Sequence, residues 1–414
     1  MYKKIKSEDL RVGMYVVDVG LSWLENPYLF MSEGVLEDEA SIEAVLADGF
    51  EEAIIDVRRS RKGSVPDDLV PLEDMSTAEQ VSQAISNTEE VSYKSSAPPP
   101  SVTVSAEMSK AQAIYSESLS FVRGFMDSAR EGKPVDMESA EPLVEDIIQS
   151  VSRNAGALIG FAKLRAYDHY TYTHCLNVSL LAVAFAKYLG LETVALRQIG
   201  LAGLFHDLGK AMIPDFILNC PGRLTPEEFT VMKRHPVLGK DVLPQNGKLP
   251  EMVLQGMMEH HEKYNGAGYP KGLKGDEISQ AGRILSVVDV YDALTSKRPY
   301  KNAMMPNKAL SILYSMAGED FYPGYVEHFI KCLGIYPVGQ VVQLNTGQVG
   351  VVAATDPAQP LRPVVIIVRD PLGRPASPRL VDLAQVGSVT ITATVLPVQA
   401  GIDPVRVLED GPST

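Results

Sequence analysis

The chain has few of the residues that stabilise small extracellular domains, and it has no run suited to a membrane span. Its 414 residues include only three cysteines, Cys175, Cys220 and Cys332. These are too few and too scattered for a disulfide framework or a thiolate metal site, and they fit a reducing compartment. The N-terminus lacks the apolar stretch of a signal peptide, and the longest apolar runs are far shorter than the roughly 20 residues that span a bilayer. We therefore expect a cytoplasmic protein without membrane insertion.

Positive charge is also in deficit. The chain carries 38 Lys and Arg residues against 52 Asp and Glu residues, which gives a formal net charge of −14. Such a surface repels a nucleic-acid backbone, so we expect neither DNA nor RNA as a partner. A phosphate ligand would need a local cluster of Lys, Arg or metal ions. The 45% content of hydrophobic residues is that of an ordinary globular protein, and the length predicts two or three folded units.

Shifts in composition divide the chain into four predicted parts. Residues 1–65 have the alternation of a small α+β domain, which we expect to be regulatory. Residues 66–105 are rich in Ser, Pro and acidic residues and predict a flexible linker. Residues 106–334 have helical periodicity, and residues 335–414 carry short β-branched runs that predict a small β extension. The predicted fold class is mainly α, with an all-helical central domain between these two smaller parts.

The histidines are concentrated in the helical part. The chain has seven histidines, and five of them lie between positions 174 and 261: His174, His206, His235, His260 and His261. Asp207 and Asp289 lie in the same part of the chain. One histidine alone is more often a core or surface residue than a ligand, but five together with two aspartates favour a metal site.

The His206-Asp207 pair illustrates why a metal is expected. It follows an apolar run, residues 199–205, and Gly209 is predicted to end that helix. A carboxylate at a buried helix end is costly unless something compensates its charge, and a divalent cation does so. Imidazole and carboxylate ligands without thiolate suit iron, manganese, nickel or zinc, and the spacing does not choose among them.

Several motifs, taken in order, resemble those of a known family. They are His206-Asp207-Leu208-Gly209-Lys210, His235, His260-His261-Glu262, Gly266-Ala267-Gly268-Tyr269-Pro270, Asp289-Val290-Tyr291-Asp292-Ala293-Leu294 and Arg298-Pro299-Tyr300-Lys301. Together they resemble the HD-GYP domain of the HD superfamily of metal-dependent phosphohydrolases. Residues 10–16 also resemble, less specifically, the opening of a domain of unassigned function that often precedes HD-GYP domains.

The resemblance implies an all-helical phosphodiesterase that hydrolyses a 3'-5' bond of cyclic di-GMP to give pGpG, in some members onward to GMP. It assigns His174, His206, Asp207 and Asp289 to one metal ion, and Asp207, His235, His260 and His261 to a second. Some members hold a third ion with a Glu at the position of Tyr170. We therefore expect two divalent transition-metal ions, iron or manganese before nickel or zinc, and mainly pGpG as product.

The resemblance also suggests roles for residues beside the metals. Lys210, Arg298 and Lys301 match positions that contact substrate phosphate, and Lys210 is expected to act in catalysis together with Asp207. Tyr269 is expected to form one wall of the substrate cleft, in a loop that could also bind a diguanylate cyclase or an adaptor protein. For the three cations the alternative is an ordinary surface charge near a helix end.

Two other functions remain open from the sequence. The domain could bind cyclic di-GMP or a cyclase and signal without turnover, or it could be another metal phosphohydrolase or a di-iron oxygenase of the same superfamily. The intact ligands and the Gly-Tyr-Pro loop favour the phosphodiesterase. The sequence does not choose the native metal, the extent of hydrolysis to GMP, the signal sensed by residues 1–65, the oligomeric state or the role of the β extension.

Overall fold

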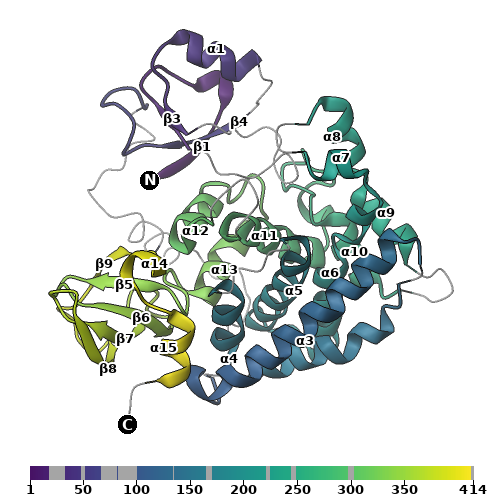
Figure 1. The fold of residues 1–414 in the computed structure, drawn as a ribbon. Coiled ribbons are helices and arrows are strands. Elements are labelled where there is room, and N and C mark those ends of the chain that lie inside the picture. The colour runs from purple at the N-terminus through teal and green to yellow at the C-terminus, as the bar shows by residue number, and fades with distance from the viewer. Residues whose placement is uncertain are drawn as a thin grey trace.

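The computed structural model describes residues 1–17, 33–47, 52–66, 82, 100–133, 135–164, 170–220, 224–243, 249–296 and 303–411, with the backbone alone at Tyr170 and Thr171. Most of the predicted linker lies outside these residues, as do Arg298 and Lys301. The described chain forms a central helical domain, an N-terminal α+β part and a C-terminal sheet (Figure 1). The predicted fold class is therefore confirmed.

The helical domain is built around α5 (Tyr170–Tyr188), which packs against neighbours on several sides. From position 172 to 186 every residue of α5 is buried, and an apolar helix without a polar face belongs in the middle of a bundle. Its neighbours are α3 (Val104–Arg130), α4 (Glu141–Leu164), α6 (Thr193–Phe205), α11 (Gln280–Thr295) and α13 (Tyr325–Leu333).

Shorter helices complete the domain on the side of α6. They are the 3₁₀ helix η4 (Leu208–Met212), α7 (Asp215–Leu218), α8 (Pro226–Met232), α9 (His235–Val242) and α10 (Glu251–Glu259), with α12 (Pro306–Ser315) beyond α11. Thr225 caps α8, and the side chain of Glu228 accepts the reciprocal capping-box hydrogen bond from the backbone nitrogen of Thr225. Because these helices are short, their ends lie close together, and those ends carry the site described below.

The N-terminal part is a four-stranded sheet in the order β1-β4-β2-β3, with one helix, α1 (Glu39–Ala47). Its strands are β1 (Tyr2–Lys6), β2 (Tyr15–Val16), β3 (Gly34–Val35) and β4 (Glu52–Asp56). Successive side chains of a strand point to opposite faces. Accordingly, Val16 and Ile55 lie in a core of their own, whereas Val17 and Ile54 join the core of the helical domain.

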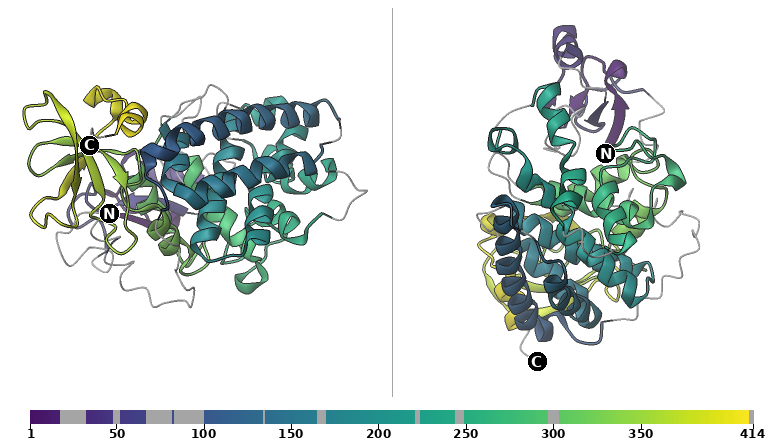
Figure 2. Two further views of the ribbon diagram at one scale, coloured as in Figure 1. Left: turned by 90° about the horizontal axis from the view of Figure 1, so that it is seen from below. Right: turned by 90° about the vertical axis from the view of Figure 1, so that its right-hand side faces the viewer.

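The C-terminal part is a five-stranded antiparallel sheet in the order β8-β7-β6-β5-β9. The left view of Figure 2 shows this sheet, in yellow and light green, at one side of the helical domain. Its strands are β5 (Val341–Leu344), β6 (Val349–Ala354), β7 (Val364–Arg369), β8 (Pro375–Asp382) and β9 (Ile391–Thr394). Two short helices, α14 (Pro397–Ala400) and α15 (Pro404–Asp410), follow, and α15 packs on α3 and α4. Within the described residues, no helix has both the length and the apolar character needed to cross a membrane.

Candidate metal centre

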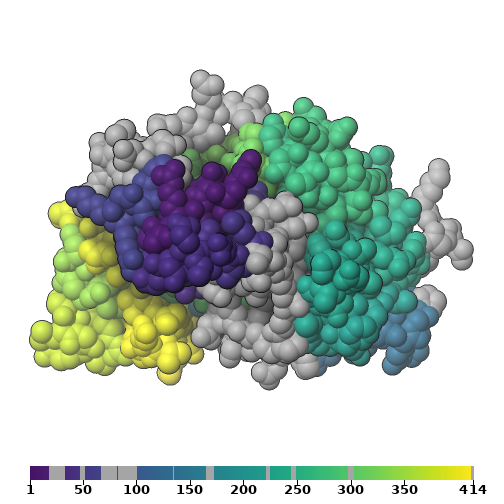
Figure 3. All heavy atoms as spheres, turned by 90° about the horizontal axis from the view of Figure 1, so that it is seen from above, coloured from purple at the N-terminus to yellow at the C-terminus, as the bar shows by residue number. Residues whose placement is uncertain are grey.

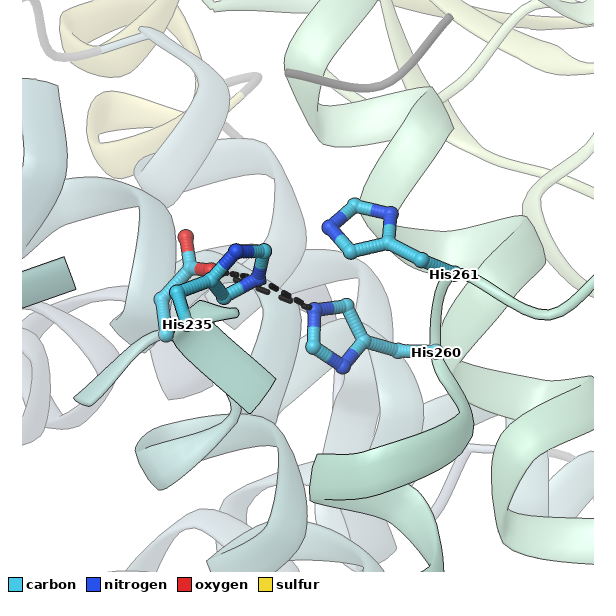
Figure 4. A group of neighbouring side chains, drawn as sticks. His235, His260 and His261 are labelled. Atoms are coloured by element: carbon cyan, nitrogen blue, oxygen red, sulfur yellow. Dashed lines mark hydrogen bonds and ion pairs between the residues drawn. The ribbon is translucent and has the colours of Figure 1, made fainter. Parts of the chain in front are cut away.

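The fold brings together all seven side chains that the sequence predicts as metal ligands. His174 lies in the second turn of α5, and Asp289 lies in the interior of α11. The other five lie at helix ends: His206 after α6, Asp207 before η4, His235 at the start of α9, and His260 and His261 after α10. Figure 4 shows His235 converging from one segment on His260 and His261, which are neighbours on another. Each of the seven is buried, with at most 7% of its surface exposed.

Four of the imidazole rings are oriented by a hydrogen bond at Nδ1. His206, His235 and His260 each bond the carbonyl oxygen three residues earlier, at distances of 2.8, 2.9 and 2.8 Å. The Nδ1 atom of His174 instead lies 2.7 Å from Oδ2 of Asp292. Because these acceptors require a proton on Nδ1, each ring, when it is neutral, presents the lone pair of Nε2 to the centre of the site, as a metal ligand does.

Several buried atoms that face the centre have no hydrogen-bond partner among the described residues. They are Nε2 of His206 and of His261, Oδ1 of Asp207 and Oδ1 of Asp289. The Nε2 atom of His174 faces the same centre, 2.9 Å from Asp289 Oδ1. Buried polar atoms are almost always paired, so a converging set of this kind indicates a site for a ligand. A divalent cation fits this donor set of imidazole nitrogens and carboxylate oxygens.

Asp207 lies between two groups of these ligands. Its Oδ2 is 3.3 Å from Nε2 of His206 and 3.6 Å from Nε2 of His174. Its Oδ1 is 3.4 Å from Nε2 of His235 and 3.9 Å from Nε2 of His260. The donor atoms of Asp207, His235, His260 and His261 lie close enough together to hold one ion, as do those of His174, His206 and Asp207. One carboxylate can therefore serve two neighbouring ions.

The charges in the site differ between these two groups. Burial lowers the pKa of His235 and His261 well below the ordinary value and that of His260 to about 4, so these rings are neutral. Burial also acts on His206, but Asp207 and Asp289 outweigh it and raise its pKa to about 10. In the metal-free protein a proton on His206 therefore partly compensates the two carboxylates.

Lys210 and Tyr269 lie beside the predicted ligands. Lys210 is buried, and its Nζ donates to Asp207 Oδ2 at 2.6 Å. The Tyr269 ring stacks on His261, with 4.7 Å between ring centroids and 27° between planes. Gly268 allows this approach, because a Cβ there would lie 2.3 Å from the backbone nitrogen of Lys263. The roles expected of Arg298 and Lys301 stay predictions, since both residues lie outside the described part of the chain.

Lys163 supports the site without a signal in the sequence motifs. It lies on α4, and its ammonium pairs with Asp292 Oδ1 and donates to Thr295 Oγ1 at 2.8 Å. Asp292, which is fully buried, thereby links Lys163 to His174. Burial raises the pKa of Asp292, but Lys163 and His174 outweigh burial and keep the carboxylate ionised. The spacing of Asp289 and Asp292 by one helical turn was the only available clue to this contact.

The expectation that Gly209 ends the helix before His206 is wrong. That helix, α6, ends at Phe205, Gly209 lies within η4, and its φ is not positive. Its lack of a side chain serves a different purpose, since a Cβ at this position would lie 1.9 Å from the carbonyl oxygen of His235 and 2.4 Å from the nitrogen of Gly239. Gly209 therefore lets α9 approach η4 closely enough for His235 to reach Asp207.

A buried His/Asp cluster without thiolate, held between the helices of a bundle, defines a metal site of the kind found in HD-type proteins. Matches to known families agree with this class. Residues 142–324 match the family described as HD domain, and residues 341–399 match the KOW domain associated with HD domain. Residues 2–140 match a domain of unknown function, DUF3391. The last match extends through α3, which packs on α4 in the helical core.

Similar proteins assign the chain to a narrower family. It is 33% identical over 388 residues to the cyclic di-GMP phosphodiesterase PA4108 of Pseudomonas aeruginosa, a match that covers 94% of this chain and 90% of that protein. The chain belongs to the HD-domain family of cyclic di-GMP phosphodiesterases. A 3'3'-cGAMP-specific phosphodiesterase 2 of Vibrio cholerae is 35% identical over 169 residues, 41% of this chain and 32% of that protein. The solved structure of Bd1817, a HDG"Y"P protein from Bdellovibrio bacteriovorus, aligns with a TM-score of 0.45 at 17% identity, covering 80% of this chain and 98% of that one.

Replacing Asp292 is expected to weaken metal binding on the His174 side of the site. The change Asp292→Asn removes the charge that orients His174 and leaves Lys163 without its carboxylate partner. Loss of such an outer carboxylate typically lowers metal affinity by about 10- to 100-fold. A competition titration with a metal-binding dye would measure this. Asp382→Asn, in the C-terminal strand β8, is the control. Equal affinities of the two variants would contradict the assigned role of Asp292.

Adding one methyl group at Gly209 is expected to displace His235. In Gly209→Ala the new Cβ would collide with the backbone of α9, which must move away from Asp207. The matched control is Gly124→Ala on α3, where a Cβ meets no atom of the described chain within 4 Å. This substitution should stabilise the helix by about 0.5–1 kcal/mol. Metal content per chain, measured after identical loading, should fall in the first variant only. A full metal complement in Gly209→Ala would show that the close approach is dispensable.

Proposed function

We propose that the protein hydrolyses a 3'-5' phosphodiester bond of cyclic di-GMP by a two-metal mechanism. The observation that carries the proposal is the set of buried nitrogen and oxygen atoms that converge on both sides of Asp207. The full-length relative in Pseudomonas aeruginosa is named for this substrate. The seven ligands implied by the motifs are also the side chains that the fold brings together, which supports one ion on each side of Asp207.

The proposed ligands form two sets, one for each ion, and Asp207 belongs to both. His174, His206, Asp207 and Asp289 would hold one ion, and Asp207, His235, His260 and His261 the other. When bound, a pair of divalent ions supplies an acidified water as nucleophile and neutralises charge on the phosphate and on the leaving oxygen. We propose iron or manganese as the native metal, with nickel or zinc as alternatives that suit the same ligands.

The chain's own residues then orient the substrate. Lys210 holds Asp207 through Oδ2 and brings a positive charge to the edge of the site, where it can polarise the phosphate or stabilise the leaving oxygen. We propose that Tyr269, stacked on His261, forms a wall against which the nucleotide packs. Arg298 and Lys301 are proposed to anchor a phosphate, Arg298 through two parallel hydrogen bonds.

The extent of reaction follows from the number of ions. A third ion in some family members is held by a Glu at the position that Tyr170 occupies here. A phenol is a poorer ligand than a carboxylate for these metals, so we propose two ions and pGpG as the main product. We also propose that the loop around Tyr269 is the surface for a diguanylate cyclase or an adaptor protein.

Metal uptake should become tighter as the pH rises. The pKa of His206, about 10 in the metal-free protein, means that its ring is protonated near pH 7 and must lose that proton to bind metal. Competition from protons therefore weakens as the pH rises toward this value, and apparent affinity rises. Calorimetry in buffers of different ionisation enthalpy should show net proton release on binding at this side of the site, because Asp289 and Asp292 outweigh burial and raise the pKa of His174 as well. Affinity that does not change with pH would contradict this charge arrangement.

Turnover by the purified protein tests the function directly. The protein is prepared anaerobically, supplied with iron or manganese, and incubated with cyclic di-GMP or with 3'3'-cGAMP while linear products are separated. Asp207→Ala should reduce kcat by at least about 100-fold, because both ligand groups lose their shared carboxylate. Asp382→Ala should retain wild-type turnover.

The outcomes separate the alternatives. Hydrolysis of cyclic di-GMP to pGpG supports the proposal. Preference for 3'3'-cGAMP would instead give this protein the substrate for which the relative that matches a shorter part of the chain is named. Tight binding of cyclic di-GMP by a metal-loaded protein without hydrolysis would establish a receptor and overturn the proposal.

A further inference from the structure

The N-terminal sheet packs on the helical domain through an interface of buried side chains. Tyr15, Val17 and Ile54 are buried in the core cluster of the helical domain, and Tyr2 packs at its edge. Strand β1 also packs against α12. Figure 3 shows the N-terminal residues covering the middle of this face, between the C-terminal sheet and the helices coloured teal and green. Both faces of a small sheet are therefore buried, one in its own core and one against the helical domain.

Lys4 is the charged residue at the centre of this interface. Its side chain is 2% exposed, and its Nζ lies 2.8 Å from Asp320 Oδ1, 2.9 Å from Glu52 Oε1 and 3.1 Å from Glu319 Oε2. Burial opposes its charge, but Asp320 and Glu52 outweigh burial and raise its pKa above the ordinary value. Asp320 is itself 3% exposed and also lies 3.4 Å from Lys263 Nζ. Lys4 therefore links β1 directly to Glu319 and Asp320 of the helical domain.

The segment that Lys4 holds is hydrogen-bonded to the loop of the candidate site. The carbonyl oxygens of Asp320 and Glu319 accept hydrogen bonds from the backbone nitrogens of Tyr264 and Asn265, at 2.9 and 3.0 Å. The rings of Tyr264 and Tyr322 meet edge to face at 5.4 Å. Residues 317–322 therefore form a support for the loop that begins after His261.

The loop that follows His261 also contacts this proposed metal ligand. The carboxylate of Glu262 accepts hydrogen bonds from the nitrogens of Lys271 and Leu273, at 2.7 and 2.9 Å, and closes the loop. The nitrogen of Tyr269 donates to the carbonyl oxygen of His261 at 3.1 Å, and its ring stacks on that histidine. A continuous series of contacts thus runs from β1 to the wall of the site.

We propose that Lys4 is a positioning residue for catalysis, through which the N-terminal domain braces the loop of residues 262–273. The N-terminal domain holds residues 317–322 in place, and these hold the loop that carries Tyr269. Displacement of the N-terminal domain loosens that wall of the site without removing any proposed metal ligand. The inference rests on the proposed function for its catalytic part, whereas the bracing of the loop is independent of it.

The test compares two lysines on one strand in the full-length protein. Lys4→Met removes the buried charge. Lys6→Met, two residues along the same face of β1, is the control, because Lys6 has a 72% exposed side chain that pairs with Glu8. Hydrogen exchange of the Tyr264 and Asn265 amides is measured without substrate, and metal content and steady-state kinetics with cyclic di-GMP are measured on the same preparations.

We expect both amides in Lys4→Met to exchange roughly 3- to 30-fold faster than in Lys6→Met, with metal content unchanged. kcat/KM should fall by a similar factor, mainly through a higher KM, because the loop contacts substrate and the ligands lie on helices.

Two results would overturn the proposal: unchanged exchange of the two amides in Lys4→Met, or kcat/KM within about 2-fold of the Lys6→Met control. If the wild type does not hydrolyse cyclic di-GMP, the proposed function fails, and the exchange measurement alone decides whether Lys4 braces the loop.

Discussion

Two carboxylates, Asp207 and Asp289, lie enclosed among the helices, and compensation of their charge is the constraint on which the centre of the protein depends. An ionised carboxylate in such a place is unfavourable by several kcal/mol unless cations or hydrogen bonds balance it. The protein surrounds the pair with imidazoles and one lysine and orients the rings through their Nδ1 atoms. Cations in the space between these groups would complete the compensation of the carboxylate charge. Metal binding and the local fold would therefore stabilise each other.

The geometry of the helices follows from this constraint. Most of the proposed ligands stand at the ends of short helices, where a change of chain direction brings residues from distant parts of the sequence together. Close approach between those ends needs residues without side chains, as Gly209 shows beside the backbone of His235. His174 and Asp289, by contrast, lie within the apolar helices α5 and α11 in the interior of the bundle. Lys163 and Asp292 then fix His174 from outside the ligand set.

The candidate metal ligands could be predicted from the sequence, whereas most residues and strands that hold them in position could not. Clustered histidines and ordered motifs identified the seven ligand candidates, because these residue types are rare and their spacing is restrictive. Strand β1 was not predicted, since Tyr2–Lys6 is rich in lysine and lacks the hydrophobic alternation of a buried strand. The edge strand β8 was missed for a related reason: its exposed residues include two prolines, which edge strands tolerate. Lys4 and Lys163 gain their importance only from tertiary contacts, so no local pattern marks them.

The proposed bridging of two ions by Asp207 is tested most directly by anomalous diffraction from metal-loaded crystals. Data collected on either side of the absorption edge of the loaded metal would locate each ion. We predict two anomalous peaks, one near His174, His206 and Asp289 and one near His235, His260 and His261, with an Asp207 oxygen bound to each. A single peak, or two peaks of which only one contacts Asp207, would contradict this bridging role.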